Sequence, residues 1–229
     1  MHNNKKIIIV ANTSWYLYNY KYSIIKKLSD LGYKVFTIAP YDSYSNRLMD
    51  LNIKFIDLQV SRRKISILKD LYLILKLKKI YKKIKPDIVH HFTIKPVIYG
   101  SIANNKYGAT INTIPGLGYS FANRNLLYFI VRLLYKFAIK SNHKIIFQNK
   151  ENFDLFRSLG IVTKEQSAII PGSGIEIDKF VNNNINKNNN TNNTIVFGLV
   201  SRLLWSKGIK EFIDASIKLY ENNPNIKSI

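Results

Sequence analysis

The sequence contains no cysteine. Disulfide frameworks, thiolate metal sites and cysteine nucleophiles are therefore excluded. Histidine is also scarce: the four histidines show no zinc-binding spacing, so we expect no metal and no cofactor. No uncharged apolar run approaches about 18 residues, the length that spans a bilayer, and the apolar run near the amino terminus is too short for a signal peptide. These absences favour a cytoplasmic protein.

Acidic residues are few, with 14 against 35 basic residues and a net charge of +21. Such an excess suggests an anionic partner: nucleic acid, anionic lipid or a phosphorylated substrate. A genome that favours lysine, isoleucine and asparagine codons would produce the same excess without any partner. The sequence has no RGG run and no RNP-type aromatic motif, so we expect no nucleic-acid partner.

Strands and helices alternate through most of the chain. Lys5 to Ala11 is an apolar, β-branched run of the kind buried on both faces of a parallel sheet. A helix from Tyr20 to Leu31, ended by Gly32, and a strand from Lys34 to Ala39 complete the first βαβ unit. Further strands are predicted at 53–58, 87–92, 109–114, 144–148 and 167–170, and further helices at 46–51, 65–84, 97–107, 126–140 and 151–159. The pattern predicts an α/β fold with a doubly wound parallel sheet, which binds ligands beyond the carboxyl ends of its strands.

The composition changes sharply at residues 182–194, NNNINKNNNTNNT. This polar, low-complexity stretch cannot bury a core and is predicted to be a linker or surface loop. A strand from Thr194 to Val200 and a helix from Ile209 to Tyr220 follow. We therefore predict a first domain at 1–172, a linker at 173–194 and the incomplete start of a second α/β domain at 195–229.

Two histidines and a lysine follow one another at the end of the strand at 87–92, in HHFTIKP. Neighbouring strand residues point to opposite faces, so at most one of His90 and His91 faces a given site. A neutral histidine there donates to a substrate hydroxyl or phosphate, and Lys95 supplies charge. A core histidine beside a solvated lysine is the alternative.

The next strand is followed by IPGLGYSF, residues 114–121. Gly116 and Gly118 allow positive φ and close approach of a ligand to the backbone, while Tyr119 and Phe121 would form a stacking wall. The G-x-G pattern is weak by itself, because Phe121 stands where dinucleotide sites have a third glycine. A plain turn explains the stretch equally well.

The stretch VFGLVSRLLWSKGIKEF, residues 196–212, indicates a strand, a turn and the start of a helix. Free backbone N–H groups and the positive end of the helix dipole favour anions at such a turn. Arg202 offers a planar fork to phosphate oxygens, Lys207 offers a point charge, and Gly208 permits close approach. Two solvated surface charges are the alternative.

Two predicted helices have features of helices that rest on a membrane surface. The helix at 65–84 has an apolar stripe beside a run of lysines, and the helix at 126–140 is apolar nearly all round. A crossover helix packed on the sheet looks almost the same. The excess apolar surface must be buried in protein or dip into a bilayer.

Four blocks of the sequence together resemble the retaining glycosyltransferases of family 4, which have the two-Rossmann GT-B fold. The blocks are DIVHHFTIKPVIYGSIA, TIPGLGYSF, IIPGSGIEIDKF and GLVSRLLWSKGIKEFIDA, and they extend over nearly the whole chain. The resemblance is strongest to bacterial enzymes that add an N-acetylhexosamine to an undecaprenyl diphosphate-linked sugar. It implies an N-terminal Rossmann-like domain followed by the first strand and helix of a second one.

The resemblance also implies roles for individual residues. Arg202 and Lys207, with Gly208, match the R-x4-K-G motif that holds the diphosphate of the donor, a UDP-sugar. His90 or His91 matches the histidine that the family places near the transferred sugar. The other cleft residues that the resemblance implies are Lys95, Gly116, Gly118, Tyr119, Gly174 and Glu176.

The implied reaction is transfer of a sugar, an N-acetylhexosamine, to a lipid-linked or polysaccharide-precursor acceptor. Configuration is retained without a protein nucleophile or a metal. The lipid acceptor and the two helices imply peripheral association with the anionic inner face of the bacterial cytoplasmic membrane. The family's E-x7-E motif and its nucleotide contacts lie further along the second domain, so we expect this domain to be truncated. The alternative is a non-catalytic fragment, or one half of a split transferase, that binds acceptor lipid or a partner.

Overall fold

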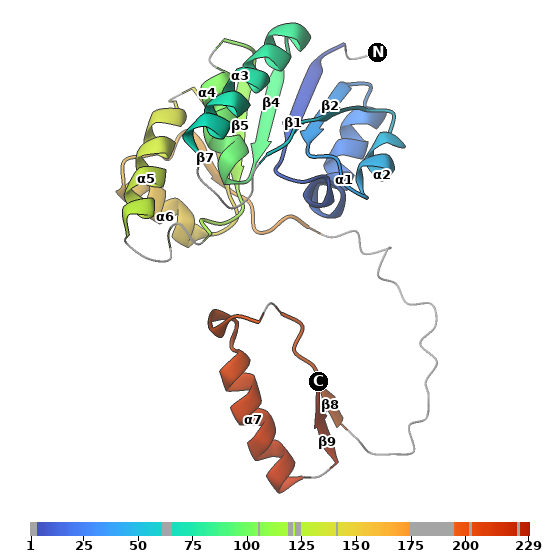
Figure 1. Ribbon diagram of the computed structural model, residues 1–229, viewed down its shortest axis with the longest axis vertical. Helices are drawn as coiled ribbons and strands as arrows, with labels where there is room; N and C mark the ends of the chain where they lie inside the picture. The colour runs from blue at the N-terminus through green and yellow to red at the C-terminus, as the bar shows by residue number, and fades with distance from the viewer. Residues whose placement is uncertain are drawn as a thin grey trace. The chain divides into compact units, whose positions relative to one another are not determined.

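The computed structural model describes residues 4–60, 66–104, 106–118, 121, 125–140, 142–174, 195–201, 203–223 and 225–229. The chain divides into two compact units, residues 1–176 and 177–229 (Figure 1). Among the described residues, no helix is both long and apolar enough to cross a membrane.

The first unit is built on a seven-stranded sheet with the order β3-β2-β1-β4-β5-β6-β7. All neighbouring strands in this sheet are parallel. The order reverses between β1 and β4, where the carboxyl ends of parallel strands form a binding crevice. The doubly wound sheet predicted from the sequence is therefore confirmed. The strands are β1 (Lys6–Val10), β2 (Lys34–Ala39), β3 (Lys54–Asp57), β4 (Ile88–Phe92), β5 (Ala109–Ile114), β6 (Lys144–Phe147) and β7 (Ser167–Ile169).

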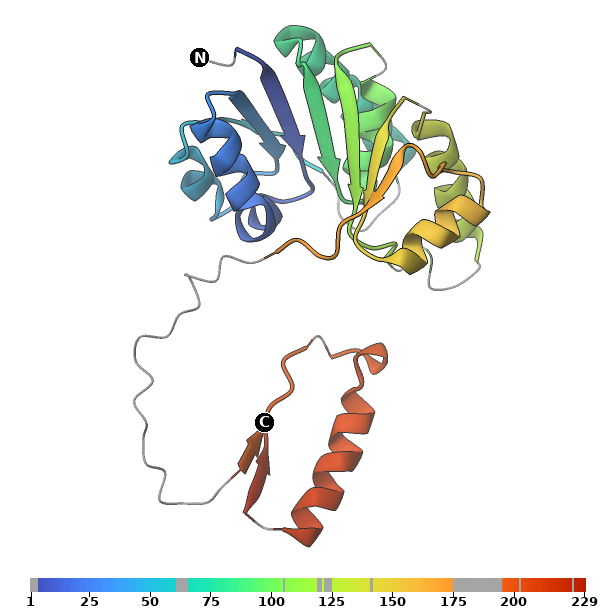
Figure 2. The ribbon, with the colours of Figure 1, turned by 180° about the vertical axis from the view of Figure 1, so that it is seen from behind.

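Helices cover both faces of this sheet, as the two opposite views show (Figures 1 and 2). One buried cluster joins Ile7 and Ile9 of β1 to α1 (Ser14–Asp30) and α2 (Ser45–Met49). The other joins Ile8 and Val10 of the same strand to the helices of the opposite face. Successive side chains of β1 thus point alternately into the two hydrophobic clusters. The helices of the second face are α3 (Ile67–Ile84), η1 (Pro96–Gly100), α4 (Ser101–Ala103), α5 (Leu126–Ala138) and α6 (Lys150–Ser158).

Two helices differ from the sequence prediction. Helix α1 begins at Ser14 rather than Tyr20, because the Thr13 side chain accepts a hydrogen bond from the Tyr16 N–H at 3.0 Å and caps the helix. The helix predicted at 97–107 is instead the π-helical turn η1 followed by the short α4. It ends at Asn104, whose side chain donates to Thr110 Oγ1 at 2.8 Å.

The second unit is a small β-α-β arrangement. It comprises β8 (Ile195–Phe197), the 3-10 turn η4 (Trp205–Lys207), α7 (Ile209–Asn222) and β9 (Ile226–Ser228). Strands β8 and β9 are parallel, and β9 was not predicted from the sequence. Helix α7 buries none of its residues.

Candidate functional site

A cavity of about 550 Å³ opens at the carboxyl edge of the sheet in the first unit. Pro115 directly follows β5 and Gln148 directly follows β6. The first turns of α1, which follow β1, contribute Tyr16 and Tyr20. The cavity therefore lies where this class of sheet binds ligands. Its lining residues are Tyr16, Tyr20, Pro115, Gln148, Ser173 and Gly174.

A buried lysine lies beside this cavity. Lys21 is only 8% exposed, and its Nζ donates to Ser173 Oγ at 3.0 Å. The same Nζ lies 4.9 Å from the centroid of the Phe92 ring. Among the described residues, no carboxylate lies within ion-pair distance of it, and burial lowers the pKa of Lys21. Burying a cation without a counter-charge costs free energy, so the space beside the Lys21 ammonium is suited to an anion.

The hydroxyl of Ser173 connects Lys21 to the wall of the cavity. It accepts a hydrogen bond from Lys21 Nζ and another from Gln148 Nε2 at 2.8 Å. Tyr16 packs on the other side, with its ring centroid 5.8 Å from Lys21 Nζ. Burial raises the pKa of Tyr16 to about 12, so its hydroxyl stays protonated at neutral pH.

His90 lies on β4, on the same side of the sheet as α1. Its ring stacks on Phe92 with centroids 4.1 Å apart, and Nε2 shares a hydrogen bond with Thr113 Oγ1 at 2.8 Å. Burial, together with the smaller effects of His91 and Lys21, lowers the pKa of His90 to about 3. His90 is therefore a neutral imidazole in the immediate surroundings of Lys21.

His91 points to the opposite side, into the core beneath α3 and η1. Its Nδ1 donates to Asn112 Oδ1 at 2.9 Å, and its Nε2 accepts from the Tyr81 hydroxyl at 3.0 Å. The side chain is fully buried, and burial lowers its pKa to about 3. Because both ring nitrogens bond to core groups, the structure gives His91 a structural position and leaves His90 as the histidine near the site.

Protonation of these histidines is expected to destabilise the first unit at acidic pH. The pKa values of His90 and His91 are about 3 in the fold against 6.5 ordinarily. Below pH 6.5 the unfolded chain binds protons that the folded chain does not, so stability that is complete above pH 6.5 is lost on acidification. At pH 5 the loss is about 2 kcal/mol per histidine. Urea unfolding at pH 7 and at pH 5 measures this loss of unfolding free energy. His143, whose pKa is lowered to about 4 by burial, adds to the same pH dependence. His91→Gln should therefore remove only the part due to His91, about 2 kcal/mol; an unchanged pH dependence would contradict the assignment.

The loop after β4 contains a strained residue, Thr93, and a lysine, Lys95, whose charge is paired with Asp70 of α3. Thr93 has a φ of 70°, in the left-handed region, and its Oγ1 is buried without a hydrogen-bond partner among the described residues. Strained backbone of this kind concentrates at functional sites. Lys95 forms an ion pair of 2.6 Å with Asp70 of α3, and the Tyr99 hydroxyl donates to the same carboxylate at 2.9 Å. The positive charge of Lys95 is therefore balanced by a carboxylate of the protein itself.

The glycine-rich stretch after β5 is only partly described. Among the described residues, only the chain neighbours of Gly116 lie near its Cβ position, and Gly118 has a φ of 61°. Gly174, predicted from the family resemblance, lines the cavity with a φ of 72°. Phe121 belongs to the core instead of a ligand wall, with its ring centroid 5.7 Å from that of Phe156. Tyr119 and Glu176 lie outside the described residues.

The second unit contains the turn that the sequence linked to diphosphate binding. Lys207 ends η4 with an exposed side chain, and Gly208 has a φ of 73° where it caps α7. The first turn of α7 thus begins directly at the glycine, as an anion site at a helix start requires. Arg202 lies outside the described residues, so its pairing with Lys207 stays a prediction.

Sequence reasoning missed Lys21, Gln148 and Ser173. A signal for Lys21 was present, because Leu17, Lys21 and Ile25 follow the i, i+4, i+8 spacing of one helix face. A lysine on an otherwise apolar stripe marks a buried cation. That stripe becomes visible only when the helix is taken to start at Ser14, before Leu17.

Comparison with known proteins assigns the chain to a protein family. Residues 6–149, more than half of the chain, match the sequence profile of the family described as Glycosyl transferase 4-like. The matched stretch contains β1 to β6 and therefore Lys21, His90 and Gln148.

Two relatives act on lipid-linked sugars according to their names. The N,N'-diacetylbacillosaminyl-diphospho-undecaprenol alpha-1,3-N-acetylgalactosaminyltransferase of Campylobacter jejuni is 29% identical over 220 residues, which are 89% of this chain and 57% of the relative. The UDP-Gal:alpha-D-GlcNAc-diphosphoundecaprenol alpha-1,3-galactosyltransferase of Escherichia coli is 29% identical over 170 residues, 70% of this chain and 43% of the relative. This chain spans about half the length of these relatives.

Solved structures share the fold. A glycosyltransferase from Rickettsia africae superimposes with a TM-score of 0.68 at 16% identity, over 99% of this chain and 68% of that chain. Anabaena HepE in complex with UDP and glucose also gives 0.68, at 17% identity over 98% of this chain and 60% of that chain. These likenesses establish the GT-B type of fold that the sequence predicted.

Proposed function

The chain belongs to the Glycosyl transferase 4-like family, and from this membership we propose that it serves the transfer of an N-acetylhexosamine from a UDP-sugar to a lipid-linked acceptor. The observation that carries the proposal is the cavity at the carboxyl edge with the buried ammonium of Lys21 beside it, which has no carboxylate partner among the described residues. A diphosphate-linked sugar supplies both a ring for the cavity and a negative charge for the lysine.

The cavity has the size and lining that an acceptor sugar requires. Its volume of about 550 Å³ lies within the range of about 300–1,000 Å³ typical of small-molecule sites. Tyr16 and Tyr20 offer aromatic surface to a sugar ring, and Gln148 and Ser173 offer hydrogen bonds to its hydroxyls. Lys21 would attract the diphosphate next to the ring, and neutral His90 would stand behind it as a hydrogen-bonding group.

The donor would be held by the turn at the start of α7. Lys207 and the helix start at Gly208 would stabilise the departing diphosphate, together with Arg202, without a nucleophile or a metal from the protein. The names of both relatives specify alpha-1,3 products, and one names UDP-Gal as donor. Because UDP-hexoses carry an α-linked sugar, we propose retention of configuration for this chain as well.

Binding of a soluble acceptor analogue tests the proposal. N-acetylglucosamine linked through diphosphate to a short farnesyl chain, titrated calorimetrically, should bind the wild-type chain. Lys21→Met should weaken it by about tenfold or more, because a hydrogen bond to a charged group is lost. Lys27→Met, a substitution of an exposed lysine on the same helix, is the charge-matched control. Equal affinity of the wild type and Lys21→Met would refute the acceptor role.

We also propose that the face covered by α3 and α5 rests on the membrane that carries the acceptor. Both helices pack on the same side of the sheet, and each leaves a row of large apolar side chains exposed. Lys69 and Lys76 on α3 and Lys136 on α5 lie in the same helices, as expected for contact with anionic lipid. The exposed apolar residues are Ile67, Leu68, Leu71, Tyr72 and Leu75 on α3, and Leu126, Phe129, Ile130, Leu133 and Phe137 on α5.

Charges placed in the α5 row are expected to release the protein from vesicles. Leu133→Glu/Phe137→Glu removes two residues that are 68% and 72% exposed. Burial of each in lipid would contribute about 1.5–3 kcal/mol, so sedimentation with phosphatidylglycerol vesicles should weaken by more than about tenfold. Ile24→Glu/Met49→Glu, which adds the same two charges at exposed apolar residues of α1 and α2 on the opposite sheet face, should leave binding unchanged. Equal losses in both variants would contradict the assignment of this face.

One half of a split transferase is a second candidate, favoured by the exposed apolar surface of the second unit. Ile213 and Ile217 of α7 are 50% and 54% exposed. Among the described residues of this unit, Ile226 alone is a buried hydrophobic residue. Such a helix requires a covering partner. Acceptor binding without any transfer from UDP-sugars by the chain alone would support this candidate, whereas turnover by the chain alone would exclude it.

A further inference from the structure

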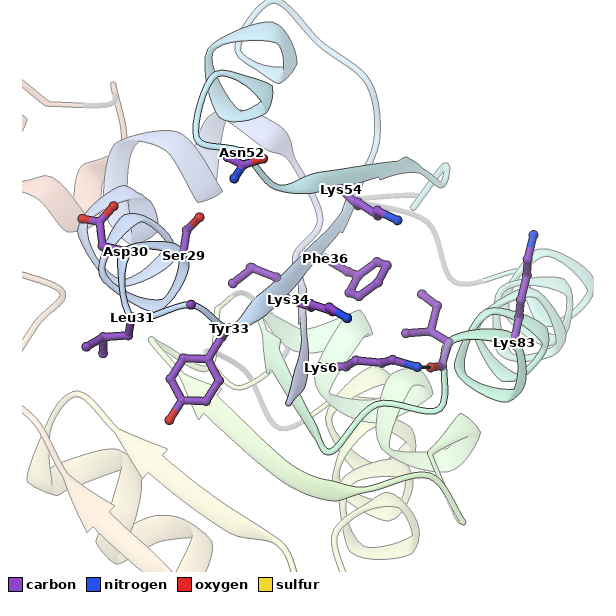
Figure 3. Close-up of a pocket in the computed structure, with 13 residues that line it drawn as sticks. Lys6, Ser29, Asp30, Leu31, Tyr33, Lys34, Phe36, Asn52, Lys54 and Lys83 are labelled. Atoms are coloured by element: carbon purple, nitrogen blue, oxygen red, sulfur yellow. Dashed lines mark hydrogen bonds between the residues drawn. The ribbon is translucent and has the colours of Figure 1, made fainter. Parts of the chain in front are cut away.

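A second hollow, of about 900 Å³, lies at the amino-terminal edge of the sheet, and Figure 3 shows the side chains that line it. The cavity at Tyr16 lies at the opposite, carboxyl edge. Its wall is formed by the first residues of three neighbouring strands and by the last turn of α3. Each of these elements contributes a lysine to it. The four lysines are Lys6 of β1, Lys34 of β2, Lys54 of β3 and Lys83 of α3.

Strand register places three of these lysines on the same face. Lys6 pairs directly with Lys34, and Lys54 pairs with Phe36, which lies two residues after Lys34. Paired residues share a face, and residues two apart along a strand share it again. In Figure 3 the side chains of Lys6, Lys34 and Lys54 accordingly extend in the same direction, past the Phe36 ring.

The hollow is held in shape by contacts that leave most of its positive charge available. Lys6 Nζ donates to the backbone oxygen of Ile84 at 2.9 Å, which fixes one ammonium group against the end of α3. Lys54 Nζ lies 5.8 Å from the centroid of the Phe36 ring. Among the described residues, no carboxylate lies within ion-pair distance of Lys34, Lys54 or Lys83.

The lining is unbalanced in charge. Four lysines face one carboxylate, Asp30, which already pairs with Lys26 at 2.7 Å and extends away from the lysines in Figure 3. Neighbouring strands lie about 4.8 Å apart, so ammonium groups on paired strands are spaced closely enough to meet adjacent phosphates of one ligand. Four like charges in one hollow repel one another, and an anion with several charges would relieve this repulsion.

We propose that this hollow is a binding site for an anion that carries two or more adjacent phosphate groups. Lys34, Lys54 and Lys83 contact its phosphate oxygens, and Lys6 lies at the base beside the end of α3. The site is at the far edge of the sheet from Lys21 and His90, so it is separate from the proposed acceptor site and does not depend on the proposed function.

Calorimetric titration of the whole chain with sodium tripolyphosphate at constant ionic strength tests the proposal. Wild-type protein should bind with a saturable heat, and Lys34→Glu/Lys54→Glu should weaken the affinity by about tenfold or more, because each substitution reverses a contacting charge. Lys164→Glu/Lys218→Glu makes the same change in net charge at two exposed lysines outside the hollow and should bind nearly as tightly as the wild type. Lys34→Arg/Lys54→Arg, which keeps both charges, should retain binding.

The same variants distinguish a soluble ligand from a lipid headgroup. Phosphatidylglycerol and diphosphatidylglycerol vesicles replace tripolyphosphate in a second series, in the Leu133→Glu/Phe137→Glu background. Binding of either probe that depends on Lys34 and Lys54 supports the site and identifies the source of the phosphates. Equal loss in the two glutamate pairs would show attraction by net charge alone and would overturn the proposal, as would a wild-type chain that binds neither probe.

Discussion

Replacing Gly100 by alanine is expected to lower the free energy of unfolding by about 3 kcal/mol. Gly100 ends η1 against the ring of His91, and a Cβ added to it would lie 2.4 Å from both Cδ2 and Nε2 of that ring. The ring cannot turn away, because Tyr81 and Asn112 hold its two nitrogens and are themselves fully buried. Either the helix moves or a buried hydrogen bond breaks.

Gly116→Ala is the matched control for this substitution. Apart from its chain neighbours, no atom of the described residues lies within 4 Å of the Cβ position at Gly116, so the free energy of unfolding should change by less than about 0.5 kcal/mol. Urea denaturation at pH 7 measures both variants. The double variant His91→Ala/Gly100→Ala should be less destabilised than the sum of its single changes, because removing the ring removes the clash. Strict additivity would show that the two residues do not interfere.

The arrangement of the sheet was predictable because each strand carries its own apolar pattern. The runs at Lys5 to Ala11 and Ala109 to Ile114 return as β1 and β5 with at most one residue of difference at either end. Short elements were harder, because contacts distant in sequence decide them. Strand β9 is three residues long and exists through pairing with β8. No local pattern marks such a strand.

The candidate site was predictable at its strand ends and not at its helix. Period-two alternation already required His90 and His91 to face opposite sides, but it did not tell which side held the cavity. That side is set by α1, whose early start at Ser14 brings Tyr16 and Lys21 over β4. The capping threonine that causes this start is a local signal, whereas the contact of Lys21 with Ser173 joins residues 152 positions apart.

Replacing Lys207 by alanine is expected to lower kcat for sugar transfer by about a hundredfold in the full-length protein, and replacing Arg202 by alanine should have a similar effect. Gly208 starts α7 with a φ of 73°, which exposes the N–H groups of the first helical turn. Glu211 stands in this turn, with Oε2 3.8 Å from where a Cβ on Gly208 would be. Its negative charge opposes a diphosphate, so the cations beside the turn must outweigh it.

Lys210 offers a control for this prediction within the same helix. It is an exposed lysine three residues from Lys207, but its Nζ forms an ion pair with Asp214 one turn further along α7. Lys210→Ala removes the same charge but leaves Lys207, the proposed diphosphate ligand in the turn, in place. The value of kcat should therefore stay within about twofold of the wild type. A loss of about a hundredfold corresponds to about 2.7 kcal/mol of transition-state stabilisation. Wild-type kcat in Lys207→Ala, or equal losses in Lys207→Ala and Lys210→Ala, would remove the diphosphate role from this turn.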